Sequence, residues 1–108
     1  MKVNSDLMRG VAEPVILKLL SERTMYGYEI IKLVNERTEG AFAWKEGTLY
    51  PCLHRLEHQG LIESSWQLTV GKPRKYYAIT QKGVAATAEK VHEARQFVHA
   101  LNLLLCAG

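Results

Sequence analysis

The chain has 108 residues and a mass of 12.2 kDa, with 47% hydrophobic and 23% charged residues, which excludes a disordered chain and predicts one domain with one core. Its longest apolar runs, such as residues 15–17 and 103–105, are far shorter than the ~20 residues of a membrane-spanning helix, and we expect no export signal. Two cysteines do not make a disulfide framework, so we expect reduced thiols and a cytoplasmic protein.

The net charge of +3 is concentrated in one stretch of the chain. Residues 1–60 contain 8 basic and 8 acidic residues, and residues 84–108 contain 2 of each kind. Between them, residues 61–83 carry four basic residues against one acidic residue. A localised cationic patch attracts the phosphates of nucleic acids, although a lysine-rich turn that serves only solubility is an alternative.

The first predicted helix covers about residues 5–22. Its apolar side chains recur at helical spacing at Leu7, Val11, Val15 and Leu19. Because Pro14 would remove a hydrogen bond inside a helix, we expect a kink or a restart there, with Pro14 in a first turn. A second helix is predicted over about residues 26–38, capped by Thr24 and stopped by Gly40.

A third helix is predicted over about residues 46–59, with one apolar and one polar face. Its apolar positions follow the spacing i, i+3, i+4, i+7 of a buried helix face: Leu49, Cys52, Leu53 and Leu56. Pro51 falls inside this helix, and Gly47, four residues earlier, offers its ring the least steric resistance. Lys45 stands where a shorter polar residue would cap the helix better.

Two strand-like runs, residues 61–68 and 74–80, follow with a turn at 70–73 between them, which predicts a β-hairpin with its basic residues at the tip. Thr80 then caps a long last helix over about residues 81–105. Its apolar seam steps by three and four residues over three heptads: Val84, Thr87, Val91, Ala94, Val98, Leu101 and Leu105. The seam carries more apolar surface than so small a core can cover, which favours pairing with a second copy of the chain.

This order of elements predicts a mostly α-helical fold with a small β-hairpin. We expect a winged helix-turn-helix DNA-binding domain over residues 1–80 and a dimerisation helix over residues 81–108. A helix fits the major groove of DNA, where base edges can be read. Because a dimer with two-fold symmetry presents two identical DNA-binding domains, we expect a pseudo-palindromic site. The residues expected at the dimer interface are Leu7, Val11, Val84, Val91, Ala94, Val98, Leu101 and Leu105.

The candidate DNA contacts gather on the third helix and on the hairpin. On and beside the helix they are Lys45, Thr48, Tyr50, Pro51, His54 and Arg55, and on the hairpin they are Lys72, Arg74 and Lys75. Tyr26 is a further candidate, because a hydroxyl at a helix start can meet a phosphate. Two alternatives stay open: Tyr26 as a half-buried packing residue, and Arg55 as one half of a structural ion pair.

Three blocks of the sequence resemble the PadR-like transcriptional regulators. These are YGYEI at residues 26–30, GTLYPCLHRLEHQGLI at 47–62 and GKPRKYYAITQKG at 71–83. The resemblance implies a homodimeric repressor that is released by a small effector, and it accounts for the proline inside the third helix. Some relatives carry a tryptophan on the last helix, but Trp44 and Trp66 lie elsewhere, so we do not expect aromatic-drug binding here.

The sequence contains no set of residues at a catalytic spacing, which indicates a protein that is not an enzyme and needs no cofactor. Of its four histidines, His92 and His99 lie about 10 Å apart along one helix, too far to share a metal within one chain, so no metal site is expected. The alternative function is a winged-helix module that binds another protein through its apolar last helix and does not recognise DNA.

Overall fold

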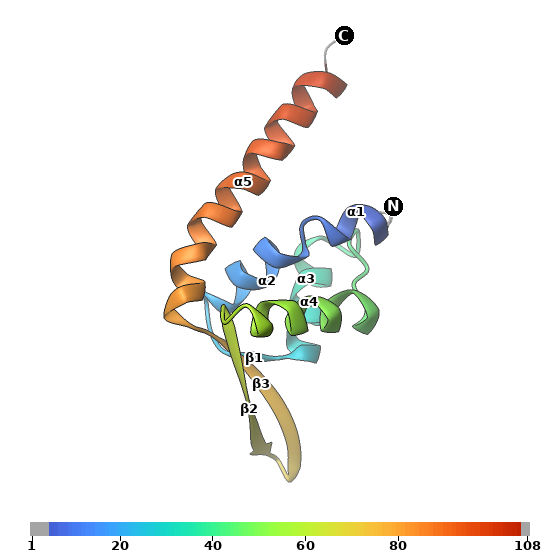
Figure 1. Ribbon diagram of the computed structural model, residues 1–108. Coiled ribbons are helices and arrows are strands. Elements are labelled where there is room, and N and C mark those ends of the chain that lie inside the picture. The colour runs from blue at the N-terminus through green and yellow to red at the C-terminus, as the bar shows by residue number, and fades with distance from the viewer. Residues whose placement is uncertain (1–4, 107–108) are drawn as a thin grey trace.

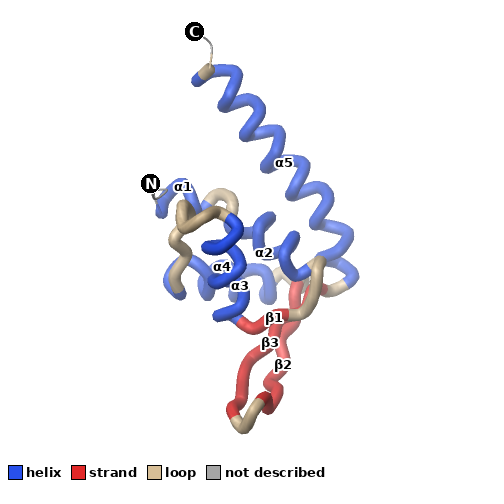
Figure 2. The backbone as a smooth tube through the Cα atoms, turned by 180° about the vertical axis from the view of Figure 1, so that it is seen from behind, coloured by secondary structure: helices blue, strands red, loops and turns tan. Residues whose placement is uncertain are grey.

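The computed structural model describes residues 5–106. In chain order its elements are α1 (Ser5–Arg9), α2 (Ala12–Leu20), β1 (Met25–Tyr26), α3 (Gly27–Arg37), α4 (Glu46–His58), β2 (Ile62–Thr69), β3 (Lys72–Ile79) and α5 (Gln81–Leu105). The first four helices form one body, the β2–β3 hairpin projects from it, and α5 rises away on the opposite side (Figures 1 and 2). The predicted fold, mostly helical with a small sheet and a long last helix, is confirmed.

The first predicted helix is in fact two helices, α1 and α2. The chain breaks at Gly10 and Val11, where the Val11 N–H donates to the Met8 carbonyl at 3.1 Å and a new helix begins at Ala12. Pro14 lies in the first turn of α2, as expected for a restart, because a proline there loses no hydrogen bond that the helix would make. The helix ends at Leu20, two residues before the predicted end.

The second helix begins at Gly27, and the prediction that Thr24 caps it is wrong. Met25 and Tyr26 are extended and pair with Tyr77 and Tyr76 of β3, so Tyr26 becomes the N-cap residue of α3. This short strand completes a three-stranded antiparallel sheet in the order β1-β3-β2. A two-residue strand has no alternation of polar and apolar side chains, and so no sequence periodicity indicates it.

Helix α4 matches its predicted limits within one residue. All four predicted core positions, Leu49, Cys52, Leu53 and Leu56, are fully buried. Burial raises the pKa of the Cys52 thiol to about 11, which keeps it protonated and unreactive at neutral pH. The loop before α4 is held by Asn35, whose side-chain amide donates to the Trp44 carbonyl at 3.1 Å and accepts from the Trp44 N–H at 2.7 Å.

The hairpin turn is shorter than predicted. Only Val70 and Gly71 lie between the strands, and both have positive φ values, 51° and 76°, as in the two-residue turns that match the twist of a hairpin. Strand β3 therefore begins at Lys72 and not at Arg74. As a consequence, Lys72 lies next to the turn, whereas Arg74 lies further along the strand and nearer the helical body.

Helix α5 has the predicted limits and the predicted cap. The Thr80 hydroxyl accepts a hydrogen bond from the Gly83 N–H at 3.0 Å and donates one to the Gly60 carbonyl at 2.7 Å. Gly83 is buried, and a Cβ atom there would lie 2.7 Å from the Ile79 Cγ1 and closer still to the Leu61 carbonyl oxygen. Only glycine lets the first turn of α5 approach the start of β2 this closely.

Candidate nucleic-acid interface

The polar face of α4 is open to solvent at most of the predicted positions. Tyr50, Pro51, His54 and Arg55 are exposed in α4, and so is Lys45 just before it, while Thr48 is half-buried. The Lys45 side chain makes no capping hydrogen bond, as its chemistry predicts. The fold thus brings most of the proposed groove contacts to one helix and buries only the opposite side of that helix.

Tyr50 links α4 to the start of α3. Its side chain lies directly over Gly27, where a Cβ atom would be 3.0 Å from the Tyr50 Cζ and closer still to the hydroxyl oxygen. On the sheet side Tyr50 neighbours Tyr77, the pKa of which is raised by burial and, to a smaller extent, by Tyr50 and Glu57. Sequence reasoning did not single out Gly27, although the signal was available in the YGYEI block, where a glycine occupies the first turn of a helix.

Tyr26 and Arg74 connect the hairpin to the start of α3, where Tyr50 also lies. The Arg74 guanidinium carbon lies 4.5 Å from the centre of the Tyr26 ring, and the Tyr26 and Tyr76 rings meet edge to face with centroids 5.4 Å apart. Tyr26 is half-buried, which is the packing alternative raised from the sequence. Arg74 is half-buried as well, so its charge is presented beside the α3 start and not at the tip of the hairpin.

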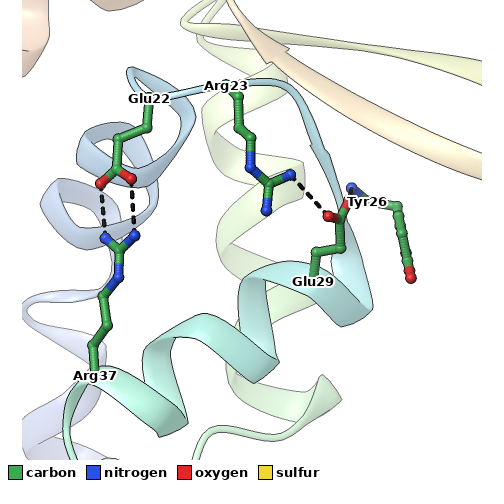
Figure 3. A network of polar contacts seen from close by, with 5 residues as sticks. All are labelled: Glu22, Arg23, Tyr26, Glu29 and Arg37. Carbon is green, nitrogen blue, oxygen red and sulfur yellow. Dashed lines mark hydrogen bonds and ion pairs between the residues drawn. The ribbon is translucent and has the colours of Figure 1, made fainter.

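A polar network fixes the angle between α2 and α3 (Figure 3). The Arg37 guanidinium donates to both carboxylate oxygens of Glu22, at 2.7 and 2.9 Å. These bonds lower the pKa of Glu22 below its ordinary value. Glu29 accepts from Arg23 at 2.8 Å and from the Tyr26 backbone N–H at 3.2 Å, so one carboxylate holds both the α2–α3 connection and the start of α3.

Arg55 makes the structural ion pair that was the alternative to DNA contact. Its Nε lies 3.7 Å from the Glu13 carboxylate of α2, and the Lys90 Nζ of α5 approaches the same carboxylate at 3.5 Å. Glu13 therefore connects three helices. This geometry favours a positioning role for Arg55 over a base contact.

The remaining hairpin cations lie on different sides of the hairpin. Lys72 is exposed beside the turn. Lys75 is half-buried, with its Nζ 5.8 Å from the centre of the Tyr77 ring, whereas Arg74 lies over Tyr26. Successive residues of a strand point to opposite faces, so the hairpin presents positive charge on both.

Five of the eight residues expected at a dimer interface line an open surface between α1, α2 and α5: Leu7, Val11, Val91, Ala94 and Val98. A cleft of about 560 Å³ is lined in part by Leu7, Val11, Ala94 and Phe97. A second cleft of about 290 Å³ adjoins it and is almost wholly apolar, with Val11 and Ala94 as shared residues. The other seam residues differ in exposure: Val91 is half-buried, and Val84, Val98, Leu101 and Leu105 are exposed.

In the described residues, 5–106, no three His, Cys, Asp or Glu side chains are arranged to hold a metal ion. The Nε2 of His92 lies 3.3 Å from the Gln96 side-chain nitrogen of the same helix. Over the same residues, no helix is long and apolar enough to cross a membrane.

Comparison with known proteins agrees with this geometry. The model of the transcriptional regulator PadR-like family matches residues 16–89. An uncharacterized protein of Lysinibacillus sphaericus is 38% identical over 104 residues, which cover 95% of each chain. A transcriptional regulator from Clostridium thermocellum has a TM-score of 0.81 and 37% identity, over 90% of this chain and 95% of that one. A PadR family transcriptional regulator from Eggerthella lenta has a TM-score of 0.78 and 32% identity, over 95% of this chain and 88% of that one. The chain therefore belongs to the PadR-like family of transcriptional regulators, which regulate transcription through DNA and are not enzymes.

Proposed function

We propose that the chain is a homodimeric repressor that binds a pseudo-palindromic site in double-stranded DNA. Helix α4 enters the major groove with Tyr50 and His54 toward the bases, and Lys72, Arg74 and Lys75 neutralise backbone phosphates. The observation that carries this proposal is that the exposed face of α4 and the basic hairpin belong to one body. Tyr50 and Tyr26 both contact the region where α3 begins.

The apolar surface of α5 supports dimerisation through this helix. Six large apolar side chains in its distal half are exposed in the described part of the chain: Phe97, Val98, Leu101, Leu103, Leu104 and Leu105. The distal half of α5 stands clear of the helical body in both views (Figures 1 and 2). Exposed apolar surface of this extent is typical of an interface, and a copy of the same helix has a matching seam.

The two clefts between α2 and α5 suit a small effector. Their volumes, about 560 and 290 Å³, are close to the range of ligand pockets, and their walls come from both the DNA-binding body and α5. A ligand there would alter the angle between the body and the dimerisation helix. It would release DNA only if it binds more tightly to the conformation of the dimer in which the two DNA-binding domains no longer fit one duplex.

The competing function is a protein-interaction module in which α5 holds a different chain. The same apolar seam supports it, but the cations around the α3 start and the hairpin have no role in it. The two functions differ in their response to DNA, and so one experiment separates them.

Selection from a randomised duplex library, with about 30 variable base pairs to accommodate two half-sites one turn apart, tests the proposal. The purified chain should enrich a sequence with two-fold symmetry and half-site centres about 10 base pairs, or a multiple, apart. The Tyr50→Ala and His54→Ala variants should enrich altered half-sites. The Lys18→Ala variant, which removes an exposed cation of α2 outside the proposed interface, should enrich the original one. Failure to enrich any sequence, or a monomeric mass in light scattering at the binding concentration, would refute the proposal.

A further inference from the structure

Strand β2 lies at the edge of the sheet. The sheet order is β1-β3-β2, so β2 pairs with β3 along one side, and no other strand of the described residues runs along its second side. The inner end of β2 is tied to the helical body, where the Ser64 hydroxyl donates to the Glu57 carboxylate of α4 at 2.5 Å. The outer part, residues 65–69, projects with the hairpin beyond the helices (Figures 1 and 2). We call this segment the free edge.

The register shows which backbone groups the free edge leaves open. A two-residue turn is closed by a hydrogen-bonded pair, here Thr69 and Lys72, and such pairs alternate with pairs that are not hydrogen-bonded. Leu68 and Pro73 therefore form a pair of the second kind, which suits a proline because it has no N–H to donate. Trp66 forms the next pair of this kind. The N–H and C=O groups of Trp66 and Leu68 thus point outward, away from β3.

The free edge lacks the side chains that usually protect an edge strand from pairing. Such strands carry charged residues or proline, whereas the sequence of the free edge, SWQLT, has neither. Two of its side chains are large, apolar and exposed, Trp66 at 68% and Leu68 at 77%, and they lie on one face of the strand. The three hairpin cations belong to β3, one strand further in. Both the backbone and the side chains of the free edge therefore suit a further strand.

The free edge matches a copy of itself. Antiparallel pairing of two copies about a two-fold axis at Gln67 sets Trp66 of each copy opposite Leu68 of the other, so apolar residues meet and no charged residue is paired. Because these residues carry the outward backbone groups, each such pair exchanges two hydrogen bonds. The cations of the two β3 strands are then separated by three strand spacings, about 14 Å, which exceeds the screening length of about 8 Å at physiological salt.

We propose that two dimers on neighbouring sites of one duplex join through antiparallel pairing of their free edges. This inference rests on the proposed function and adds a contact between dimers to it. The hairpin and α5 project on opposite sides of the body, so dimerisation through α5 leaves the free edges open (Figure 1). So short a strand pair is weak between dimers in solution. On one duplex the free edges are held at a high effective concentration, and the consequence is cooperative binding to paired sites.

Duplexes with one and with two copies of the selected site test the inference. Centre-to-centre spacings in steps of about 10 base pairs keep both dimers on the same side of the duplex. In a gel-shift titration, at one of these spacings, the second dimer should bind at least about tenfold more tightly than a dimer binds to the single site. An additional half turn between the sites places the dimers on opposite sides and should abolish this cooperativity.

Charge at Gln67 tests the pairing itself, because the pairing places this residue opposite its own copy. Gln67→Lys and Gln67→Glu should each lose cooperativity, since like charges directly opposite one another destabilise paired strands. An equal mixture of the two variants should recover it, because opposite charges then meet. The same two substitutions at Gln81, which is exposed at the start of α5, are the matched control and should keep the cooperativity of the wild type. Each variant is compared with its own affinity for the single site.

Leu68→Pro tests the backbone hydrogen bonds. It removes an outward N–H group but no hydrogen bond to β3, so the variant should bind the single site like the wild type and lose cooperativity. Leu68→Ala loses the same side chain but keeps the N–H group, and should retain part of the cooperativity.

The outcomes that overturn the inference are distinguishable from failure of the proposed function. Independent binding of two dimers at every spacing would overturn the inference and leave the proposed function intact. Cooperativity that both Gln67 variants retain would do the same, because another surface would then join the dimers. Failure to bind even the single-site duplex would refute the proposed function, and the inference with it.

Discussion

A methyl group added at Gly83 should disturb the joint between the DNA-binding body and α5. In Gly83→Ala the new Cβ would lie 2.7 Å from the Ile79 Cγ1, against an ordinary contact of at least 3.4 Å, and even closer to the Leu61 carbonyl oxygen. The helix must therefore move by roughly 0.7 Å or more at its base, because a backbone carbonyl cannot turn away as a side chain can. If α5 tilts as a rigid rod, a shift of this size across its first turn, about 5.4 Å of helix, becomes about 5 Å at the far end of its 25 residues, which rise 1.5 Å each.

Overpacking of this kind costs about 2 kcal/mol, which lowers Tm by roughly 10 °C in a domain of this size. Thermal unfolding followed by circular dichroism measures the change, and a titration with the selected duplex should show weakened binding because the two heads are re-angled. For thermal unfolding, the matched control is Gly47→Ala in α4, where nothing lies within 4 Å of the added Cβ and alanine favours the helix by up to about 1 kcal/mol. A Gly83→Ala protein as stable as the wild type would show that the first turn of α5 does not pack against Leu61 as described.

Three further predictions concern the helix-turn-helix and the thiols. Gly27→Ala should change the free energy of unfolding by no more than about 1 kcal/mol, because the Tyr50 side chain can swing aside and alanine is a better helix former than glycine. The same variant should weaken duplex binding in an anisotropy titration, because it displaces the Tyr50 hydroxyl. Unchanged affinity would remove Tyr50 from the interface. A thiol reagent should modify Cys106 rapidly in the native protein and Cys52 only after denaturation, since Cys52 is buried with its pKa raised to about 11; two fast thiols would contradict this packing. The pKa of Glu22 is lowered in the folded state, so its ion pair with Arg37 stabilises the fold at pH values above the ordinary pKa of 4.5, and this stabilisation is lost as the pH falls through the lowered pKa. In urea unfolding, Glu22→Gln should be less stable than the wild type at pH 7, and the difference should disappear in strong acid.

The helical part of the fold could be predicted because its signals are local. Leu49, Cys52, Leu53 and Leu56 repeat with the period of a helix, and all four are buried. The cap at Thr80 is likewise visible in the sequence, since its hydroxyl bonds to the N–H three residues later.

The features that sequence reasoning missed depend on contacts between distant segments. Strand β1 exists because Met25 and Tyr26 meet β3, about 50 residues away, and two residues have no periodicity of their own. The position of Arg74 over Tyr26 follows from the same pairing. The pairing across the hairpin was missed as well, because the turn consists of Val70 and Gly71 alone and ends two residues earlier than the predicted turn at 70–73.

The division of the chain into a DNA-binding domain and a dimerisation helix remains a prediction, as do the individual DNA contacts. The ion pair of Arg55 with Glu13 makes Arg55 the weakest of them. Tyr50 is the strongest candidate on α4, because its side chain is both exposed at one edge and fixed against the start of α3.

The salt dependence of binding to the selected duplex tests the central claim most directly. Three hairpin cations in each of two subunits predict a slope of log affinity against log salt of about −5, at about −0.9 per phosphate neutralised. The double variant Arg74→Ala, Lys75→Ala should retain a slope of about −2 from the remaining hairpin lysine of each subunit. Binding that is nearly independent of salt, or a double variant with the slope of the wild type, would contradict the account of this hairpin as the part of the protein that holds the DNA backbone.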